Sequence, residues 1–293
     1  MAQIANALAP EQLTDLQAKS TEVRRLIIEA IQFAKAGHLG GPLSVTDILV
    51  ALYFNVARID PAHPHWEDRD RIVLSKGHSS IALYCALALR GYLPIEETLT
   101  FDAINSRLQG HPDMTKLPGV DMSSGSLGQG LSPSVGFALG AKLKKQDFHT
   151  WCILGDGEIQ EGQIWEAAFV ADRYRLDNLT AILDFNKLQQ FGWLTGHEGK
   201  QRLIQPSSTQ PGKQFESFGW HVLECDGHDL DSLVNAMQSA KRHKGSPTAI
   251  IAHTVKGKGV SYMENDYNWH SKVMTDAEYE TALTDLVGPS VKG

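Results

Sequence analysis

The sequence predicts an α/β fold in which a parallel sheet carries helices on both faces. The main observation is that strand-like and helix-like segments alternate strictly beyond about residue 150, and such alternation implies a parallel sheet covered on both sides. The second observation is that no internal repeat, low-complexity tract or convincing linker interrupts the 293 residues. One domain is therefore the better interpretation.

The elements before residue 110 are predicted to be helices with one short strand. Residues 11–41 carry apolar side chains at helical spacing, and Gly37 is the expected helix stop. Residues 43–54 form a second, more buried helix with Ser44 as its candidate N-cap. The remaining elements of this region are a strand at 70–75 and a buried helix at 81–92.

A long loop separates these elements from the alternating part of the chain. Residues 110–130 are rich in glycine, proline and serine without any period, and loops of this length are often functional. The segments that follow are strands at 151–156, 179–185, 219–225 and 248–254 and helices at 163–175 and 231–245. Asp229 is the expected N-cap of the last helix, and Gly245 its end. Ligands of open parallel sheets bind beyond the carboxyl ends of the strands.

The composition excludes several classes of function. The net charge of −7 gives no basic surface for nucleic acid or an anionic membrane. No apolar run is long enough to span a bilayer, and the N-terminus lacks the basic start and apolar block of a secretory signal. Cys85, Cys152 and Cys225 are isolated in apolar stretches, which predicts reduced core residues of a cytoplasmic protein.

Two polar residues follow neighbouring strands of the predicted sheet. Asp156 lies between two glycines at the end of the strand at 151–156, and Asn186 follows the next strand, thirty residues later. Each could simply belong to a turn or a helix cap, because Asp-Gly turns are common. Together, a carboxylate and an amide at one sheet edge suit Mg²⁺ or Ca²⁺, and Mg²⁺ prefers few protein ligands plus phosphate oxygens. The spacing therefore indicates a phosphate-bearing cofactor.

The segment "GDGEIQEGQIWEAAFVADRYRLDNLTAILDFN" resembles the thiamine diphosphate signature, and five further segments resemble transketolases. In chain order these are "AGHLGGPLSVTDILVALYF", "LSKGHSSIALY", "GHPD", "SSGSLGQGLSPSVGFALG" and "NWH". The resemblance covers about residues 20–275. Because transketolases normally continue into a pyrimidine-binding and a C-terminal domain, the chain resembles the N-terminal subunit of a split transketolase. It implies one diphosphate-binding domain over 1–293, with a helical arm at about 1–36 and a tail at about 275–293.

The resemblance assigns the cofactor site. It implies thiamine diphosphate and Mg²⁺, for which Ca²⁺ or Mn²⁺ can substitute. The implied metal ligands are the side chains of Asp156 and Asn186 and the carbonyl of Leu188. The implied cofactor contacts are the backbone N–H of Gly157, the rings of His78 and His270, the side chain of Asn186, and Gly125 and Leu127 in "GSLG".

Four of the twelve histidines lie in segments of this resemblance. Imidazole suits two-way proton transfer near neutral pH. The resemblance gives His38 and His270 to proton transfer, His78 to diphosphate contact and His111 to the donor's terminal hydroxyl. It gives Glu161 to a proton link between two cofactor sites at the subunit interface, although a carboxylate there would also favour a helix N-terminus.

The remaining polar residues are predicted to have no catalytic role. Other histidines are expected to face solvent, for example His63, His65, His149 and His243, and Glu158 is expected to be solvated. His228 is expected to lie in a helix-start turn. Lys256 and Lys258 follow the last strand and either reach toward cofactor phosphates or line a lid. Ser271 stands where the family usually has glycine after the last histidine.

The implied activity is transfer of a two-carbon ketol unit from a ketose phosphate donor to an aldose acceptor. Since the glutamate that activates the aminopyrimidine lies in the family's pyrimidine domain, a second, C-terminal transketolase subunit is expected as partner, in a dimer of heterodimers. The alternatives are an α subunit of a 2-oxoacid dehydrogenase-like thiamine enzyme, a non-catalytic cofactor-binding subunit, and an NAD-binding domain. Against the NAD-binding alternative, the segment "GSLGQG" lacks the G-x-G-x-x-G order that such domains carry.

Overall fold

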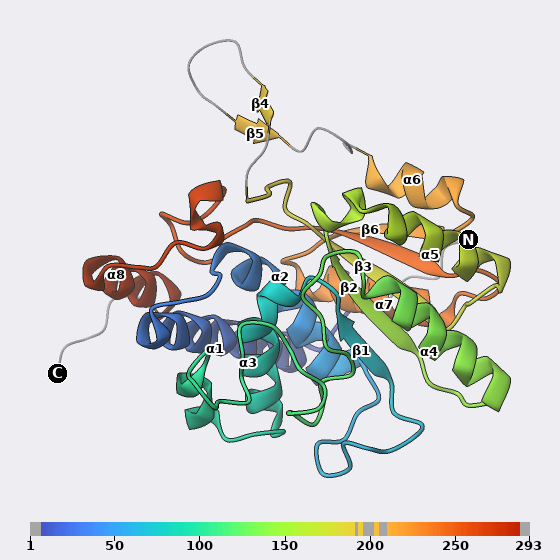
Figure 1. Ribbon diagram of the computed structural model, residues 1–293, viewed down its shortest axis with the longest axis horizontal. Coiled ribbons are helices and arrows are strands. Elements are labelled where there is room, and N and C mark those ends of the chain that lie inside the picture. Colours follow the sequence, from blue (N-terminus) through green and yellow to red (C-terminus); the bar gives the residue numbers. More distant parts are fainter. Residues whose placement is uncertain (1–6, 191–192, 196–201, 205–209, 288–293) are drawn as a thin grey trace.

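The computed structural model describes residues 7–190, 193–195, 202–204 and 210–287. Its main sheet has five parallel strands in the order β1-β2-β3-β7-β6 (Figure 1). The strands are β1 (Arg71–Leu74), β2 (Thr150–Gly155), β3 (Leu179–Phe185), β6 (His221–Asp226) and β7 (Thr248–His253). Because every pair is parallel, all five carboxyl ends meet at one edge of the sheet. The predicted fold class is confirmed.

Helices cover both faces of this sheet (Figure 1). One layer contains α1 (Pro10–Ala34), α2 (Gly40–Ala51), α3 (Ser80–Arg90), α7 (Leu230–Arg242) and α8 (Asp276–Val287). The other contains α4 (Leu131–Lys144), α5 (Gly162–Arg173) and α6 (Pro211–Ser217). Successive strand residues alternate between the two layers: Ile153 packs in the core of the first, whereas Cys152 and Leu154 pack in the core of the second.

Shorter elements complete the chain. A π-helical turn at Leu52–Val56 extends α2, and 3₁₀ turns lie at Gly77–Ser79, Ile95–Thr100, Glu158–Gln160 and Tyr267–His270. β4 (Trp193–Thr195) and β5 (Arg202–Ile204) pair antiparallel, apart from the main sheet (Figure 1).

Several predicted boundaries shift in the structure. The expected N-cap role of Ser44 is wrong, because α2 already begins at Gly40 and places Ser44 inside the helix. Asp229 does cap α7, its carboxylate accepting hydrogen bonds from the backbone N–H of Asp231 and Ser232. α1 ends at Ala34, and Gly37 lies beyond it with φ of +115°, where a Cβ would lie 2.4 Å from Ile31 Cδ1. Gly37 is thus required by the following turn.

The first and last helices pack together. α8, which lies within the segment expected to be a tail, runs beside α1 (Figure 1), and its Ala282 is fully buried in the first core. Residues 1–6 of the expected arm and 288–293 of the expected tail lie outside the described residues. All three cysteines are buried and free, as predicted. In the described part of the chain, no helix has the length and apolarity needed to cross a membrane.

Candidate functional site

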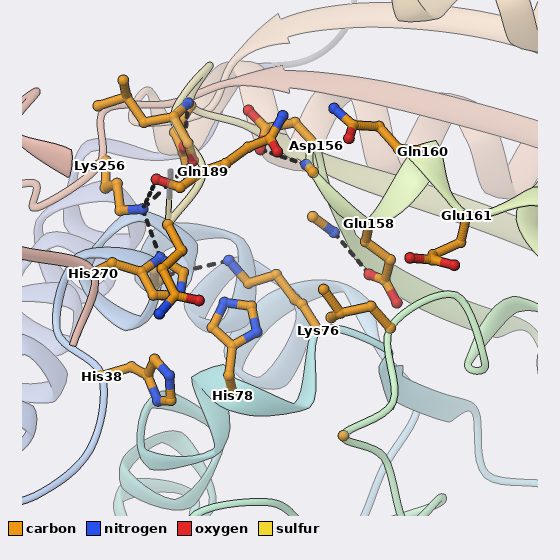
Figure 2. Close-up of a pocket in the computed structure, with 18 residues that line it drawn as sticks. His38, Lys76, His78, Asp156, Glu158, Gln160, Glu161, Gln189, Lys256 and His270 are labelled. Carbon is orange, nitrogen blue, oxygen red and sulfur yellow. Dashed lines mark hydrogen bonds between the residues drawn. The ribbon is translucent and has the colours of Figure 1, made fainter. Parts of the chain in front are cut away.

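A cavity of about 430 Å³ lies at the carboxyl ends of the central strands (Figure 2). It gathers side chains from the ends of β1, β2, β3 and β7, the turn before α2, and the loop between α3 and α4. Ten of the predicted site residues line it: His38, His78, Gly125, Leu127, Asp156, Gly157, Glu161, Asn186, Leu188 and His270. His111 is exposed and does not line the cavity, but it lies beside Gly125, where a Cβ would be 3.1 Å from His111 Cδ2.

Asp156 and Asn186 follow β2 and β3, which are neighbours in the sheet. The Asp156 carboxylate accepts hydrogen bonds from the backbone N–H of Gly157 (2.8 Å) and of Lys187. Lys187 adopts φ of +65°, and this turn also lets Asn186 Oδ1 accept from the N–H of Leu188 at 3.1 Å. The predicted arrangement of a carboxylate and an amide at one sheet edge is therefore present.

The donor set at this edge fits a hard divalent cation. Asp156, Asn186 and Leu188 all line the cavity. Between them they can offer a carboxylate, an amide oxygen and a backbone carbonyl, and oxygen donors of this kind are what Mg²⁺ and Ca²⁺ take. Burial and the nearby carboxylate of Asp184 raise the pKa of Asp156 to about 7. The ionised carboxylate of Asp156 is therefore destabilised in this environment, and a cation bound beside Asp156 would stabilise the ionised form.

Lys256, which follows β7, provides a buried positive charge in the cavity, and Figure 2 shows it pointing toward His270. Its Nζ lies 2.8 Å from His270 Nδ1, 3.4 Å from the Gln189 carbonyl and 3.5 Å from that of Leu188. Within the described residues its ammonium forms no ion pair with a carboxylate. Burial lowers its pKa to about 8. A buried cation with neutral hydrogen-bond partners suits an anionic ligand such as a diphosphate.

Lys258, by contrast, points away from the cavity. Its Nζ pairs with the carboxylate of Glu264 at 3.4 Å, and it does not line the cavity. Of the two lysines whose roles the sequence left open, only Lys256 reaches the site.

Three histidine rings form a compact cluster at the cavity (Figure 2). The ring centroids of His38, His78 and His270 lie 5.2 Å from one another, and His78 stacks on His270. Burial lowers the pKa of all three, with help from the positive charge of Lys256, and that of His270 falls to about 3. The rings are therefore neutral near pH 7 and can accept hydrogen bonds.

Glu158 is not solvated, and that prediction is wrong. Its side chain is buried, and its two oxygens accept hydrogen bonds from Ser75 Oγ, from the N–H of Gly128 (2.9 Å) and from the N–H of Gly155 (3.0 Å). Burial raises its pKa. A 3₁₀ turn at Glu158–Gln160 precedes α5 and directs the carboxylate inward. Glu158 thus joins the ends of β1 and β2 to the loop that carries Leu127.

The other histidines divide into two groups. His63 and His65 are exposed as predicted, and His243 is half-buried against His221. The prediction for His149 is wrong: it is buried against Trp151, with Nε2 2.8 Å from Thr180 Oγ1. It is the residue immediately before β2 and faces inward with the strand.

His228 lies in the turn before α7, as predicted, but it also makes two long-range hydrogen bonds. Its Nδ1 contacts Asp47 Oδ2 at 2.7 Å, and its Nε2 accepts from the N–H of Val255 at 2.8 Å. Asp47 is in turn bound by the guanidinium of Arg24. The segment that carries Lys256 is thereby tied to α1 and α2.

Sequence reasoning missed one buried ion pair beside the cavity. Lys76, two residues after the end of β1, pairs with Asp184 of β3, and both side chains are almost completely buried. Asp184 also accepts hydrogen bonds from the hydroxyls of Ser44 and Thr254. A lysine that directly follows an apolar strand was the available signal, because such a charge needs a buried partner.

Comparisons with known proteins show which family the chain resembles. The family model described as "Transketolase, thiamine diphosphate binding domain" matches residues 16–287. The chain is 43% identical over 276 residues to "6-deoxy-6-sulfo-D-fructose transketolase subunit SqwG" of Clostridium sp. (strain MSTE9), covering 94% of this chain and 98% of that one. It is 40% identical to one of the apulose-4-phosphate transketolase subunits of Phocaeicola vulgatus, covering 94% and 95%.

Longer transketolases match over part of their length. Human transketolase is 40% identical over 278 residues, which are 92% of this chain and 42% of the human protein. The crystal structure of transketolase from Campylobacter jejuni superposes with a TM-score of 0.85 at 33% identity, covering 95% of this chain and 43% of that one. This chain therefore spans about two fifths of the solved transketolase chains that it matches. By its family match, its fold and its full-length similarity to proteins named as transketolase subunits, the chain belongs to the transketolase family as a thiamine diphosphate-binding domain.

Proposed function

We propose that the chain is the N-terminal subunit of a two-component transketolase that transfers a two-carbon ketol unit from a ketose to an aldose. The observation that carries the proposal is the cavity, where an acid, an amide and a buried lysine meet at one sheet edge in a chain of this family. Relatives of nearly the same length are named as subunits. Their names support a partner, which we propose to be the C-terminal transketolase subunit in a dimer of heterodimers.

Thiamine diphosphate, when bound, supplies the nucleophilic carbon and the electron sink for breaking the carbon–carbon bond. Asp156, Asn186 and the Leu188 carbonyl would hold Mg²⁺, with Ca²⁺ or Mn²⁺ as substitutes. The N–H of Gly157, the ring of His78 and the ammonium of Lys256 would bind the diphosphate. Gly125 and Leu127 would contact the cofactor rings from the opposite loop.

The histidine cluster would handle the protons of the substrate. Neutral His38 and His270 can accept the proton that the donor hydroxyl loses and return it to the acceptor's oxygen. His111, beside Gly125, would bind the donor's terminal hydroxyl. Glu161 lies exposed on the rim of the cavity, which suits the proposed proton link to a second site across a subunit interface.

The substrate class is a sugar with a terminal anionic group. The names of the relatives mention 6-deoxy-6-sulfo-D-fructose and apulose 4-phosphate, a sulfonate and a phosphate. Sugar phosphates are accordingly the first substrates to test. Residues that grip the anionic end are expected on the partner subunit.

The test is reconstitution. The chain is mixed with a partner that resembles the C-terminal half of transketolase, and ketol transfer is measured with thiamine diphosphate and Mg²⁺. We expect turnover from the mixture and none from either chain alone. Full turnover by the lone chain would refute the two-component arrangement. A mixture that binds the cofactor but transfers nothing would favour a non-catalytic subunit, and activity on a 2-oxoacid would favour the dehydrogenase-like alternative.

A further inference from the structure

We propose that Ser44 is a positioning residue that fixes which end of the Asn186 side-chain amide faces the cavity. Ser44 lies inside α2 and is fully buried. The inference rests on the proposed metal-binding role of Asn186, because only the oxygen of an amide can bind a cation.

The hydrogen bonds of Ser44 define a direction. Its Oγ lies 2.6 Å from Asp184 Oδ2, 3.0 Å from the Gly41 carbonyl and 3.3 Å from Asn186 Nδ2. A hydroxyl has one proton to donate, and the charged carboxylate is the nearer and stronger acceptor. With that proton directed to Asp184, the Ser44 oxygen can only accept a hydrogen bond from Asn186. It therefore selects the NH₂ end of the amide.

Asp184 is held as an acceptor from several sides. It is fully buried and receives hydrogen bonds from the ammonium of Lys76 and from the hydroxyl of Thr254, in addition to that of Ser44. Because Lys76, Thr254 and Ser44 each donate to Asp184, this carboxylate is the acceptor in all three contacts, and Ser44 has a constant partner for its proton.

The other end of the amide is specified independently. Asn186 Oδ1 accepts from the N–H of Leu188 at 3.1 Å. A rotated amide would place its NH₂ group against that N–H and its oxygen against the Ser44 oxygen, so both contacts would become repulsive. The correctly oriented oxygen keeps a second lone pair for a cation.

Removal of the Ser44 hydroxyl should therefore weaken metal binding without changing any proposed ligand. Residues that hydrogen-bond to metal ligands typically change metal affinity by about 10- to 100-fold when they are removed. We expect a loss in this range for Ser44→Ala. Thr46→Val is the matched control, since Thr46 is also buried in α2 and its hydroxyl bonds only to the Pro42 carbonyl in the described structure.

The test measures Mn²⁺ affinity by electron paramagnetic resonance in the assembled two-subunit protein with thiamine diphosphate present. We expect Ser44→Ala to lose about 10- to 100-fold in affinity and Thr46→Val to match the wild type. The same substitution made in the Asn186→Asp protein distinguishes a positioning role of Ser44 from general destabilisation. Asn186→Asp offers an oxygen at both ends, so adding Ser44→Ala to it should cause no further loss.

Three results would overturn the inference. Wild-type affinity in Ser44→Ala would refute it while leaving the proposed function intact, and an equal loss in both backgrounds would show that Ser44 acts only on stability. If Ser44→Ala does not fold, a metal-bound crystal structure of the wild type decides. A distance from Ser44 Oγ to Asn186 Nδ2 beyond hydrogen-bond range would then refute it. A wild-type protein that binds cofactor without any metal would overturn the proposed metal site itself.

Discussion

The buried carboxylate of Glu158 should be a major determinant of stability at the cavity. Glu158→Ala leaves three donors without this acceptor: the buried Ser75 Oγ and N–H of Gly128, and the partly buried N–H of Gly155. Each unsatisfied buried group costs about 1–3 kcal/mol. Because water can enter part of the vacated space, we expect a total loss of about 3–5 kcal/mol in the free energy of unfolding.

Glu158→Gln should cost less, and the reason is geometric. One oxygen of the carboxylate accepts from Ser75 and Gly128, and the other accepts from Gly155. An amide keeps only one acceptor, so one set of contacts is lost whichever way it points. We expect a loss of about 1–3 kcal/mol.

The assay is urea-induced unfolding followed by tryptophan fluorescence, with the slope checked for each variant. Glu166→Ala is the control, since Glu166 is an exposed glutamate on α5, and surface changes of this kind stay within about 0.5 kcal/mol. An Ala variant at 158 as stable as this control would refute the hydrogen-bond account of the cavity wall.

Two further predictions concern charge. Burial lowers the pKa of His149 to about 3 in the folded protein, whereas a histidine in the unfolded chain has a pKa of about 6.5. Between these two values only the unfolded chain binds the proton, so the free energy of unfolding should fall by about 1.4 kcal/mol for each unit that the pH is lowered. His149→Gln should flatten the plot of unfolding midpoint against pH in that window, and an unchanged slope would contradict the assignment. Lys256→Met should lower thiamine diphosphate affinity by about 10- to 100-fold in calorimetry, because it removes a charged hydrogen-bond donor. The melting temperature should stay equal or rise, because the variant no longer buries the Lys256 charge. Unchanged affinity would remove Lys256 from the diphosphate site.

The sequence is informative where a pattern is local. Alternating strands and helices predict the sheet, and a polar residue directly after an apolar strand indicates that Asp156 and Asn186 are neighbours at its edge. β2 and β3 are adjacent in the sheet and connected by one helix. The sequence separation of such a strand–helix–strand unit therefore predicts that the two strand ends are neighbours in space.

The predictions that failed depend on contacts between distant segments. Glu158 can be buried because Ser75, 83 residues away, and Gly128 donate hydrogen bonds to it. No local sequence pattern indicates such distant partners. The residue type of Ser44 predicts a helix start, but its hydroxyl bonds to Asp184 of β3. His149 is one residue outside β2, where burial is set by Thr180 on the next strand.

The central claim is that an acid and an amide after adjoining strands hold a cation that anchors a diphosphate. The most direct measurement is calorimetric titration of thiamine diphosphate into the assembled two-subunit protein, with Mg²⁺ and with a chelator, for the wild type and for Asp156→Ala. The account predicts that binding requires Mg²⁺ and disappears in the variant. Equal binding in all four conditions would contradict it.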